Sequence, residues 1–543
     1  MIKATRINGA VRGLALSLLF TATMSAQNAP RALTARLTDY VEMPLTGNFS
    51  VRDTRSQPAR LNFLVEEPGH NRLFVSDSSG PLYIIDKKTH RPTVYLNFNG
   101  SADGKGLFPR FIADGSLASG LLGFTFDPDY SHNGIFYTLH MEDAASTAPA
   151  VPKSGVVQGL DTSKFVPTKA IFTPAGESGI TREAVLVEWK DRNVKDAKFE
   201  GTVREVMRIE LLNGIHPTND VTFNPTARRG SPEWRVLYIS TGDGGTGEMD
   251  DVRRLNPQRL DHFGGKIIRI VPDLREHVAS SQVSENGQYR IPRDNPFFST
   301  PGARKEIWAY GMRNPHRMTW DVESPGEANL LAFVIGANGG NPVRYETIDI
   351  IRRGANYGYP LREGPEYRPD EPIYGPLAAD KTVPLRISDT VVLNDRVSLQ
   401  DSALAYKTTV EGNAIAGGFV YRGKRWPELQ GSVVFGDITS GRIFYARMAD
   451  LVTDTDGDPT TLAPYAEIKT DLPQLAASRA NTRTPASAAG RQNVGGSTAA
   501  GGTRRSLPPP FFRADLRIAT DSDGEIYLMT KSDGVIRRIE SIE

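Results

Sequence analysis

The chain has 543 residues, of which 39% are hydrophobic and 23% are charged, the balance of a folded globular protein. Its formal net charge is +1, so neither nucleic acid nor an anionic membrane is predicted as its main partner. It contains no cysteine, which excludes disulfides, zinc–thiolate sites and thiol nucleophiles. A chain of this length without disulfides must be stabilised by a large core.

The first predicted element is a secretory signal peptide over residues 1–26. Lys3, Arg6 and Arg12 precede an apolar run, and small residues then lead to Ala26. This order is typical of an export signal. A membrane anchor is the alternative, but it needs about 20 apolar residues, and this run is shorter. We therefore expect a periplasmic or secreted protein, with no membrane span in its mature part.

Short runs rich in β-branched and aromatic residues follow, separated by turns with Gly, Asp, Asn and Pro. Six units share this layout. Their central strands are predicted at Leu73–Val75, Ile135–Tyr137, Leu237–Ile239, Leu330–Val334, Val433–Phe435 and Ile526–Leu528.

Repeated strand units of this kind must pack on one another, and radial packing leaves only short edges. We predict an all-β, six-bladed β-propeller that forms a single domain over residues 27–543. A β-sandwich with long loops is the alternative.

Two long insertions interrupt these units. Residues 141–200 are polar and irregular, without a predicted strand beyond the start of the segment. Residues 476–510 are rich in Ala, Ser, Gly and Arg, and six arginines but no acid occur between Asp471 and Asp515. This composition predicts a low-complexity, solvated loop rather than a functional basic patch.

Gly242, Gly244 and Gly247 match the pattern G-x-G-x-x-G after a predicted strand. A dinucleotide-binding fold also needs alternating strands and helices, which this chain lacks. We interpret the glycines as a turn within a propeller blade.

Five segments carry a family resemblance. In chain order they read GLLGFTFDPDY at 120–130, His216 with Asn224-Pro225 and GDGG at 242–245, EIWAYGMRNP at 306–315, GANYGYP at 354–360, and GGFVYRG at 417–423. Together they resemble the glucose/sorbosone dehydrogenase family of soluble sugar dehydrogenases that use pyrroloquinoline quinone (PQQ). The resemblance implies PQQ and Ca²⁺ on the top of the propeller. It also implies a sugar substrate, an aldose or a related polyol, oxidised at its C1 hydroxyl by hydride transfer to PQQ.

The resemblance also implies roles for individual residues. His216, at the entrance to a strand, is the expected base, because the C1 hydroxyl must lose a proton to a group with a near-neutral pKa. Arg313 and Asn314 match a cofactor-binding pair, in which Arg313 would stabilise charge on the quinone oxygen. Arg422 and, more weakly, Arg442 are candidates for binding the PQQ carboxylates.

The expected calcium site departs from the family pattern. The resemblance places a backbone ligand at Tyr357 and a carboxylate at the position of Thr347, so the adjacent Glu346 is the candidate substitute. Backbone carbonyls near residues 339–341 are further candidates, since Ca²⁺ prefers oxygen ligands. Residues 217–220 also depart from the pattern after His216, which leaves the sugar preference open.

Two other functions remain as alternatives. A metal-dependent propeller hydrolase or lactonase would need several carboxylates around the central channel. A non-catalytic sugar- or ligand-binding propeller is the second alternative, because residues 118, 219, 220 and 347 differ from the family pattern. The sequence indicates no particular electron acceptor and no oligomeric state.

Overall fold

The computed structural model describes most of the chain between residues 30 and 543. The described ranges are 30–46, 57–101, 105–114, 117–171, 179–249, 251–324, 327–337, 344–368, 381–408, 410–483 and 513–543. The expected signal peptide, residues 484–510 of the expected loop and the carbonyls at 339–341 lie outside these ranges. Within them, no helix is both long and apolar enough to cross a membrane.

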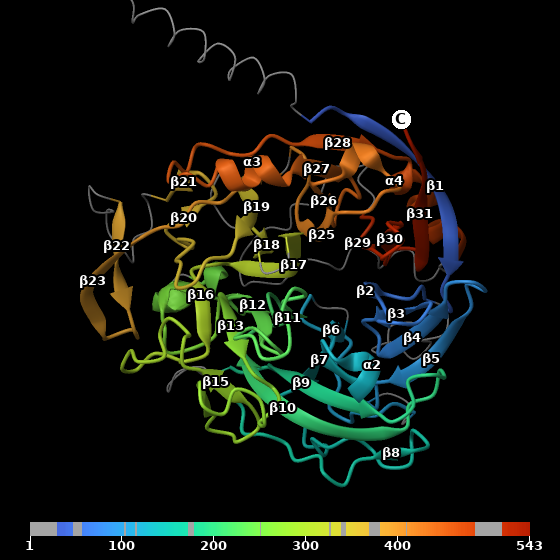
Figure 1. Ribbon diagram of the computed structural model, residues 1–543, viewed down its shortest axis with the longest axis horizontal. Coiled ribbons are helices and arrows are strands. Elements are labelled where there is room, and N and C mark those ends of the chain that lie inside the picture. The colour runs from blue at the N-terminus through green and yellow to red at the C-terminus, as the bar shows by residue number, and fades with distance from the viewer. Residues whose placement is uncertain are drawn as a thin grey trace, which may run out of the picture.

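The described chain is mostly β-structure arranged as a propeller (Figure 1). Four sheets follow one another along the first three quarters of the chain. The first contains β2 (Leu61–Glu66), β3 (Arg72–Asp77), β4 (Pro81–Asp86) and β5 (Pro92–Asn97). The second contains β6 (Leu121–Phe126), β7 (Ile135–Asp143), β9 (Arg182–Asp191), β10 (Gly201–Leu211) and the short β8 (Leu160–Asp161). The third contains β11 (Thr218–Phe223), β12 (Leu237–Thr241), β13 (Lys266–Ile270) and β16 (Ile307–Tyr310). The fourth contains β17 (Asn314–Ser324), β18 (Glu327–Ile335), β19 (Tyr345–Ile350) and β24 (Leu404–Lys407).

The remaining main strands form one eight-stranded sheet. In spatial order it contains β25 (Ile415–Tyr421), β26 (Ser432–Asp437), β27 (Ile443–Arg447), β28 (Ala466–Lys469), β1 (Leu33–Glu42), β31 (Val535–Ile542), β30 (Ile526–Thr530) and β29 (Leu516–Thr520). Strand β1 lies antiparallel to β31 and parallel to β28, so it joins the two ends of the described chain within one sheet. Figure 1 shows β1, in blue, beside the red β31.

Smaller elements decorate this framework. Three hairpins contain β14 (Ser281–Val283) with β15 (Arg290–Pro292), β20 (Arg362–Glu363) with β21 (Glu366–Tyr367), and β22 (Thr382–Arg386) with β23 (Val392–Ser398). The helices are α2 (Tyr130–Asn133), α3 (Met448–Thr453) and α4 (Leu472–Arg483), with 3₁₀ turns η1 (Thr246–Glu248), η2 (Val252–Gln258) and η3 (Pro427–Leu429).

The first strands of the units surround the propeller axis. Strands β2, β6, β11, β17, β25 and β29 contact one another in that order, and β29 contacts β2 again, which closes the ring. All six begin at the same end of the axis. For example, Asn62 near the start of β2 bonds to the carbonyls of Leu121 and Leu122 at the start of β6. We call this end the entry face, because it gathers the loops that precede these strands.

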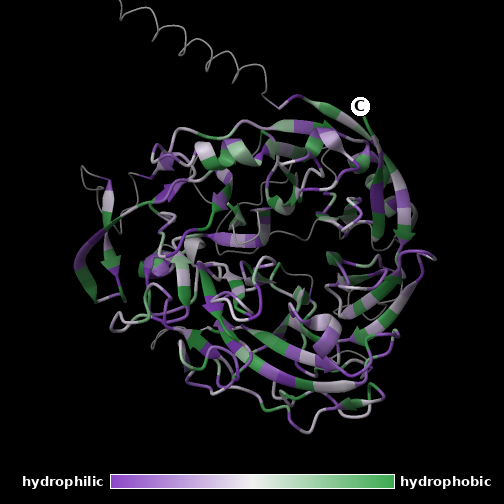
Figure 2. Ribbon diagram, viewed as in Figure 1, coloured by the Kyte–Doolittle hydropathy of each residue, from purple (hydrophilic) through white to green (hydrophobic). Residues whose placement is uncertain are grey.

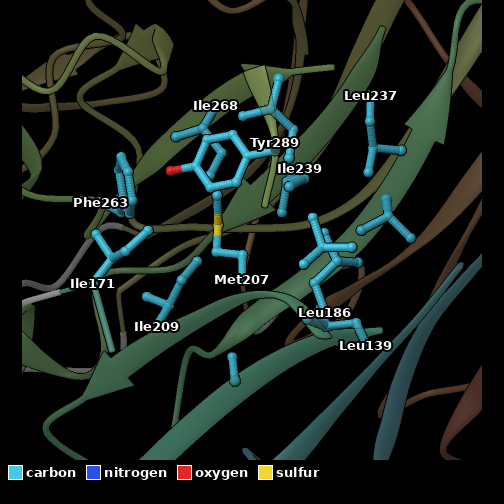
Figure 3. Packing of buried hydrophobic residues seen from close by; sticks show 14 of the residues in the cluster. Leu139, Ile171, Leu186, Met207, Ile209, Leu237, Ile239, Phe263, Ile268 and Tyr289 are labelled. Carbon is cyan, nitrogen blue, oxygen red and sulfur yellow. The ribbon is translucent and has the colours of Figure 1, made fainter. Parts of the chain in front are cut away.

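Apolar side chains fill the space between neighbouring sheets. Strand residues alternate between hydrophobic and polar along much of the framework (Figure 2), as expected when side chains point to opposite faces of a pleated strand. Figure 3 shows the packing between the second and third sheets, where Leu139, Leu186 and Met207 face Leu237 and Ile239. At about 25 cal/mol per Å² of buried apolar surface, such interfaces can stabilise a propeller without disulfides.

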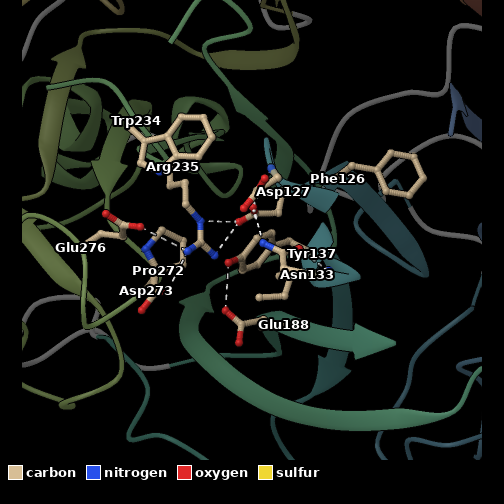
Figure 4. Close-up of polar contacts among 12 residues, drawn as sticks. Phe126, Asp127, Asn133, Tyr137, Glu188, Trp234, Arg235, Pro272, Asp273 and Glu276 are labelled. Atoms are coloured by element: carbon tan, nitrogen blue, oxygen red, sulfur yellow. Dashed lines mark hydrogen bonds and ion pairs between the residues drawn. The ribbon is translucent and has the colours of Figure 1, made fainter. Parts of the chain in front are cut away.

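Buried ion pairs supplement this packing at the opposite end from the entry face. Arg235, before β12, donates to Asp127 after β6 at 2.8 Å and to Asp273 after β13 at 2.6 Å (Figure 4). The two sheets are therefore clamped together by one guanidinium. Burial raises the pKa of Asp127, while the Arg235 charge opposes that shift. The Phe-Asp-Pro motif of the second unit thus has a structural role.

The structure corrects three expectations about the strands and loops. Strand β9 lies inside the segment 141–200 that was expected to be irregular, and its Ala184–Val187 stretch is buried. Strand β1, which completes the last unit, was not predicted at all. Helix α4 occupies the start of the expected 476–510 loop, and Ala476 and Ala480 are fully buried.

Candidate functional site

A buried histidine–carboxylate pair lies on the entry face. His216 precedes β11, and its Nδ1 lies 2.6 Å from Oδ1 of Asp243 in the turn after β12. Both side chains are buried, with 5% and 0% of their surface exposed. The backbone of His216 has a left-handed φ of 47°, which only the surrounding contacts can hold for a residue with a Cβ. The ring is therefore fixed in place rather than free to rotate.

Glycines in the turn after β12 hold the Asp243 carboxylate. Its Oδ1 accepts a hydrogen bond from the Gly245 amide and its Oδ2 from the Gly247 amide, each at 2.9 Å. A Cβ at Gly247 would lie 2.1 Å from the Tyr359 hydroxyl, so a larger residue does not fit. Burial alone would raise the pKa of Asp243, but the charges of His216 and Arg313 lower it. The G-x-G-x-x-G pattern is confirmed as a propeller turn, and it serves to seat this carboxylate.

Arg313 and Asn314 lie beside this pair. The Arg313 carbonyl accepts the Asp243 amide at 2.8 Å, and the Arg313 guanidinium donates to the Gly336 carbonyl. Asn314 begins β17, and its side-chain oxygen accepts a hydrogen bond from the side-chain amide of Asn219 at 2.7 Å. The structure therefore brings His216, Arg313 and Asn314 together, and adds Asp243 and Asn219 to them.

A buried tyrosine adds a polar group to the same region. The hydroxyl of Tyr359 is buried, and the described residues provide no hydrogen-bond partner for it. Burial raises the pKa of Tyr359, so the hydroxyl stays protonated and is a donor at neutral pH. A buried donor without an acceptor costs about 1–3 kcal/mol. An oxygen of a bound ligand would remove that cost.

The side chains of Glu346 and Thr347 are not arranged as the expected calcium ligands. The Glu346 carboxyl accepts hydrogen bonds from the Ile415 amide at 2.9 Å and from the Thr408 hydroxyl at 3.3 Å. Burial raises the pKa of Glu346 to about 8, and both carboxyl oxygens are already occupied by these hydrogen bonds.

The other two expected ligands have different surroundings. Thr347 follows Glu346 on β19, so its side chain points to the opposite face of the strand, where it bonds to Asp349. The Tyr357 hydroxyl donates to the Ile350 carbonyl at 2.7 Å within a hydrophobic cluster. The expected ligand there is the backbone carbonyl of Tyr357, which this contact does not involve, so that assignment stays a prediction. The structure therefore does not support Glu346 as the replacement for the carboxylate ligand that the family pattern expects at position 347.

Arg422 and Arg442 lie away from the histidine pair. Arg422 follows the far end of β25 and bonds to Asp321 at 2.6 Å. Asp321 is seven residues along β17 from Asn314, a separation of roughly 20 Å at 3.3 Å per residue. Arg442, directly before β27, binds both oxygens of Glu467 on β28, at 2.8 and 2.9 Å, three strands from the inner strand β25. Neither expected carboxylate-binding arginine is brought to the site.

One group of acids elsewhere has the spacing of a metal site. Glu66, Asp521 and Asp523 place carboxylate oxygens within 4.8 Å of one another. The Lys87 ammonium occupies their centre, at 2.8, 2.7 and 2.6 Å from the three carboxylates. The lysine ammonium already pairs with all three carboxylates, so the cluster is a structural ion-pair network.

The geometry on the entry face suits removal of a proton from a bound hydroxyl. A histidine whose Nδ1–H is held by a buried carboxylate presents Nε2 as the basic nitrogen, and the carboxylate stabilises the imidazolium formed. Arg313 supplies a fixed positive charge beside that pair. Asp243 was not identified from the sequence. An acid between two glycines directly after a strand was the signal available for it.

The fold and the site together define a β-propeller with a buried histidine–aspartate pair on one face. The family model described as "Glucose / Sorbosone dehydrogenase" matches residues 56–458. The chain belongs to this family.

Individual relatives cover less of the chain. The HIPL1 protein of Arabidopsis thaliana is 25% identical over 394 residues, covering 70% of this chain and 51% of that protein. The quinoprotein glucose dehydrogenase B of Acinetobacter calcoaceticus is 23% identical over 259 residues, covering 46% of this chain and 42% of that protein. The chain spans about half the length of the curated relatives it matches first.

A solved structure supports the fold. The soluble aldose sugar dehydrogenase from Escherichia coli, in its apo form, matches with a TM-score of 0.50 and 17% identity. The match covers 92% of this chain and 98% of that one. At this identity the likeness concerns the architecture alone.

Proposed function

We propose that this protein is a PQQ-dependent oxidoreductase that oxidises the C1 hydroxyl of an aldose or related sugar. The observation that carries the proposal is the buried His216–Asp243 pair beside Arg313 and Asn314. Family membership and the similarity to a quinoprotein glucose dehydrogenase support the choice of cofactor. PQQ, when bound, supplies a quinone that accepts a hydride.

The residues of the chain have distinct parts in this proposal. His216 takes the proton of the sugar hydroxyl on Nε2. Asp243 keeps the ring oriented and stabilises the positive charge that the ring acquires. Arg313 places a cation where negative charge develops on a bound oxygen, and Asn314 positions the ligand by its amide. The Tyr359 hydroxyl, which has no hydrogen-bond partner within the described part of the chain, fits a ligand rich in oxygen acceptors.

The proposal includes several features of the whole protein. We interpret the eight-stranded sheet as two blades that share the pairing of β28 with β1, which makes six blades in all. We propose that residues 27–543 form this one domain after export to the periplasm or the medium. Calcium is retained from the family resemblance as a cofactor, with ligands other than Glu346 and Thr347.

The hydrolase or lactonase alternative is disfavoured by charge. It requires several carboxylates converging near the axis. Among the described residues, the groups that meet there are mainly cationic: Arg317, Arg517 and Lys531.

Reconstitution tests the proposal. Purified protein would be titrated with PQQ in the presence of Ca²⁺, binding followed by absorbance, and the loaded protein then screened with aldoses and a redox dye. Saturable binding and sugar-dependent dye reduction support the enzyme. Saturable sugar binding without any dye reduction would instead support a non-catalytic propeller.

A further inference from the structure

Three positively charged side chains converge on one asparagine where the inner strands begin. The side-chain oxygen of Asn62 accepts hydrogen bonds from Arg517 Nε at 3.3 Å and Lys531 Nζ at 3.1 Å. Its backbone oxygen accepts one from Arg317 Nη2 at 3.2 Å. These cations come from β29, the turn after β30, and β17. We call Arg317, Arg517 and Lys531 the axial cation cluster.

Arg317 crosses the propeller axis to reach this position. It starts from β17, yet its guanidinium bonds to the carbonyls of Asn62 on β2 and Asn219 on β11. Its Cβ and Cγ also lie against Gly417 of β25, where an added Cβ would come within 2.7 and 2.6 Å of them. One side chain thus contacts the first strands of three other units, and the cluster sits on the axis itself.

Among the described residues, no ion pair directly balances the charge of the cluster. Every hydrogen bond recorded there for its three members goes to a neutral oxygen, and no carboxylate lies within ion-pair distance of them. Two acids attract these cations without pairing with them: Asp220 raises the pKa of Arg317, and Asp515 raises the pKa values of Arg517 and Lys531, each against the larger effect of burial. The direct partners of both acids are other groups. Asp220 accepts the Met318 amide at 2.8 Å, and Asp515 is paired with Arg513 at 2.6 Å.

The electrostatic cost of this arrangement is evident in the pKa values. Burial, followed by the charge of Arg317, lowers the pKa of Arg517 to about 9. Burial and the charge of Arg517 lower the pKa of Lys531 well below its usual value. Buried cations in proteins are normally paired with anions, because an isolated buried charge is strongly unfavourable.

From this geometry we propose that the axial cation cluster is a binding site for an oxyanion of the carboxylate type. The two arginines offer planar guanidinium groups, and the lysine offers a compact ammonium group. Together they suit a ligand with more than one carboxylate oxygen. The anion site deepens the proposed function, and the choice of PQQ as one probe rests on that function. The ligand's carboxylates belong either to the cofactor or to a separate acid, such as the sugar acid that forms when water opens the lactone produced by C1 oxidation.

The cluster is adjacent to the candidate active site. Arg317 bonds to the Asn219 carbonyl, and the Asn219 amide bonds to Asn314. The Nε2 of His316, the residue before Arg317, is buried without a hydrogen-bond partner among the described residues. The charge of His216 also contributes to lowering the pKa of His316. An anion in the cluster therefore lies next to the group proposed as the base.

The test uses the full-length protein with two probes, malonate and PQQ. Malonate binding is measured by calorimetry at constant ionic strength and PQQ binding by absorbance. The variants are Arg517→Met and Lys531→Met. The matched control is Arg229→Met, which removes the same charge from a side chain that is 71% exposed. Thermal melts of the ligand-free proteins accompany each titration.

We expect wild type and Arg229→Met to bind alike. Each cluster variant should bind malonate at least about tenfold more weakly, the loss expected for one charge-assisted hydrogen bond. The ligand-free variants should melt no lower than wild type, because each substitution removes repulsion. Competition between malonate and PQQ would assign the site to the cofactor, and independent binding would assign it to a separate acid.

Two results would overturn the proposal: wild type binds neither probe, or both cluster variants bind both probes as wild type does. If both cluster variants bind both probes as wild type does and still oxidise sugar normally, the anion site is refuted but the proposed enzyme function stands. Conversely, malonate binding that the variants lose, in a protein that never binds PQQ, would retain the anion site and refute the PQQ function.

Discussion

Replacing Asp243 by asparagine tests the role of the carboxylate behind His216. Asp243 accepts the His216 Nδ1 proton and two backbone amides, of Gly245 and Gly247, through its two oxygens. An asparagine amide nitrogen faces a donor whichever way the group is turned. The substitution therefore removes the negative charge that stabilises a protonated His216, and it leaves at least one donor without an acceptor.

Other enzymes with a histidine base indicate how large the loss of activity in Asp243→Asn should be. Losing a carboxylate that orients and stabilises a histidine base costs about 10²- to 10⁴-fold in kcat. This corresponds to about 2.7–5.5 kcal/mol in the activation free energy. The lost hydrogen bond should lower the free energy of unfolding by about 1–3 kcal/mol. We expect PQQ affinity to change little, because Asp243 acts through His216.

The assay is PQQ- and sugar-dependent dye reduction, with a PQQ titration and a thermal melt on the same preparations. Asp523→Asn is the control, since its side chain is 70% exposed. If Asp243→Asn stays folded, binds PQQ and retains kcat within about threefold of wild type, well below the loss expected for a general base, the reasoning is refuted.

Three further predictions follow from the structure. Arg313→Ala should impair both PQQ affinity and turnover, and Arg313→Lys should recover affinity better than turnover, because lysine keeps the charge but loses the planar fork; PQQ titrations and dye-reduction rates check this, and an early melt with normal PQQ binding would contradict it. Because burial raises the pKa of Glu346 to about 8, the folded state holds a proton that the unfolded state releases near pH 4.5, so this residue's contribution to stability falls as the pH rises from about 5 to 8. Glu346→Gln should reduce the loss of stability between pH 5.5 and 8.5 in urea unfolding, and an unchanged pH dependence would refute the assignment. Deleting residues 476–505 should lower the melting temperature by several degrees, since it removes the buried Ala476, whereas deleting 486–505 should shift it little; equal melts for the two deletions would show that the end of α4 contributes nothing.

Much of the fold was predictable because its strands are local and apolar. The central strand of each unit is a short β-branched or aromatic run, such as Leu237–Ile239 in β12. The closing strand β1 was not predictable in the same way. Its partners, such as Ile468 and Ile539, lie more than 400 positions away, and nothing in its own sequence indicates them. Helix α4 was missed because alanines in a low-complexity stretch suggest a loop until packing is known.

The predictable part of the site was His216, Arg313 and Asn314, which carry a positional or motif signal in the sequence. His216 stood out by its place before a strand, but Asp243 is 27 residues away and meets it only through the pairing of β11 with β12. Arg422 shows the opposite case. It belongs to a segment that resembles the family, yet the length of β25 carries it to the far end of the propeller. Distance along a strand, which the resemblance does not measure, decided that assignment.

The axial cation cluster depends even more strongly on tertiary structure. Arg317, Arg517 and Lys531 are far apart in the sequence and lie in no charged run. None of the three stands out in its local sequence, because the inner strands contain other polar residues as well. Only closure of the propeller ring brings β17, β29 and the turn after β30 around Asn62.

A single-turnover experiment tests the central claim most directly. PQQ-loaded wild type, His216→Ala and His132→Ala would each be mixed anaerobically with an aldose, and reduction of the bound quinone followed by absorbance. His132 is the matched control, because its side chain is 81% exposed. We predict that all three bind PQQ, that wild type and His132→Ala reduce it on mixing, and that His216→Ala does so at least about 10²-fold more slowly. Equal reduction rates in His216→Ala and wild type would contradict the assignment of His216 as the base.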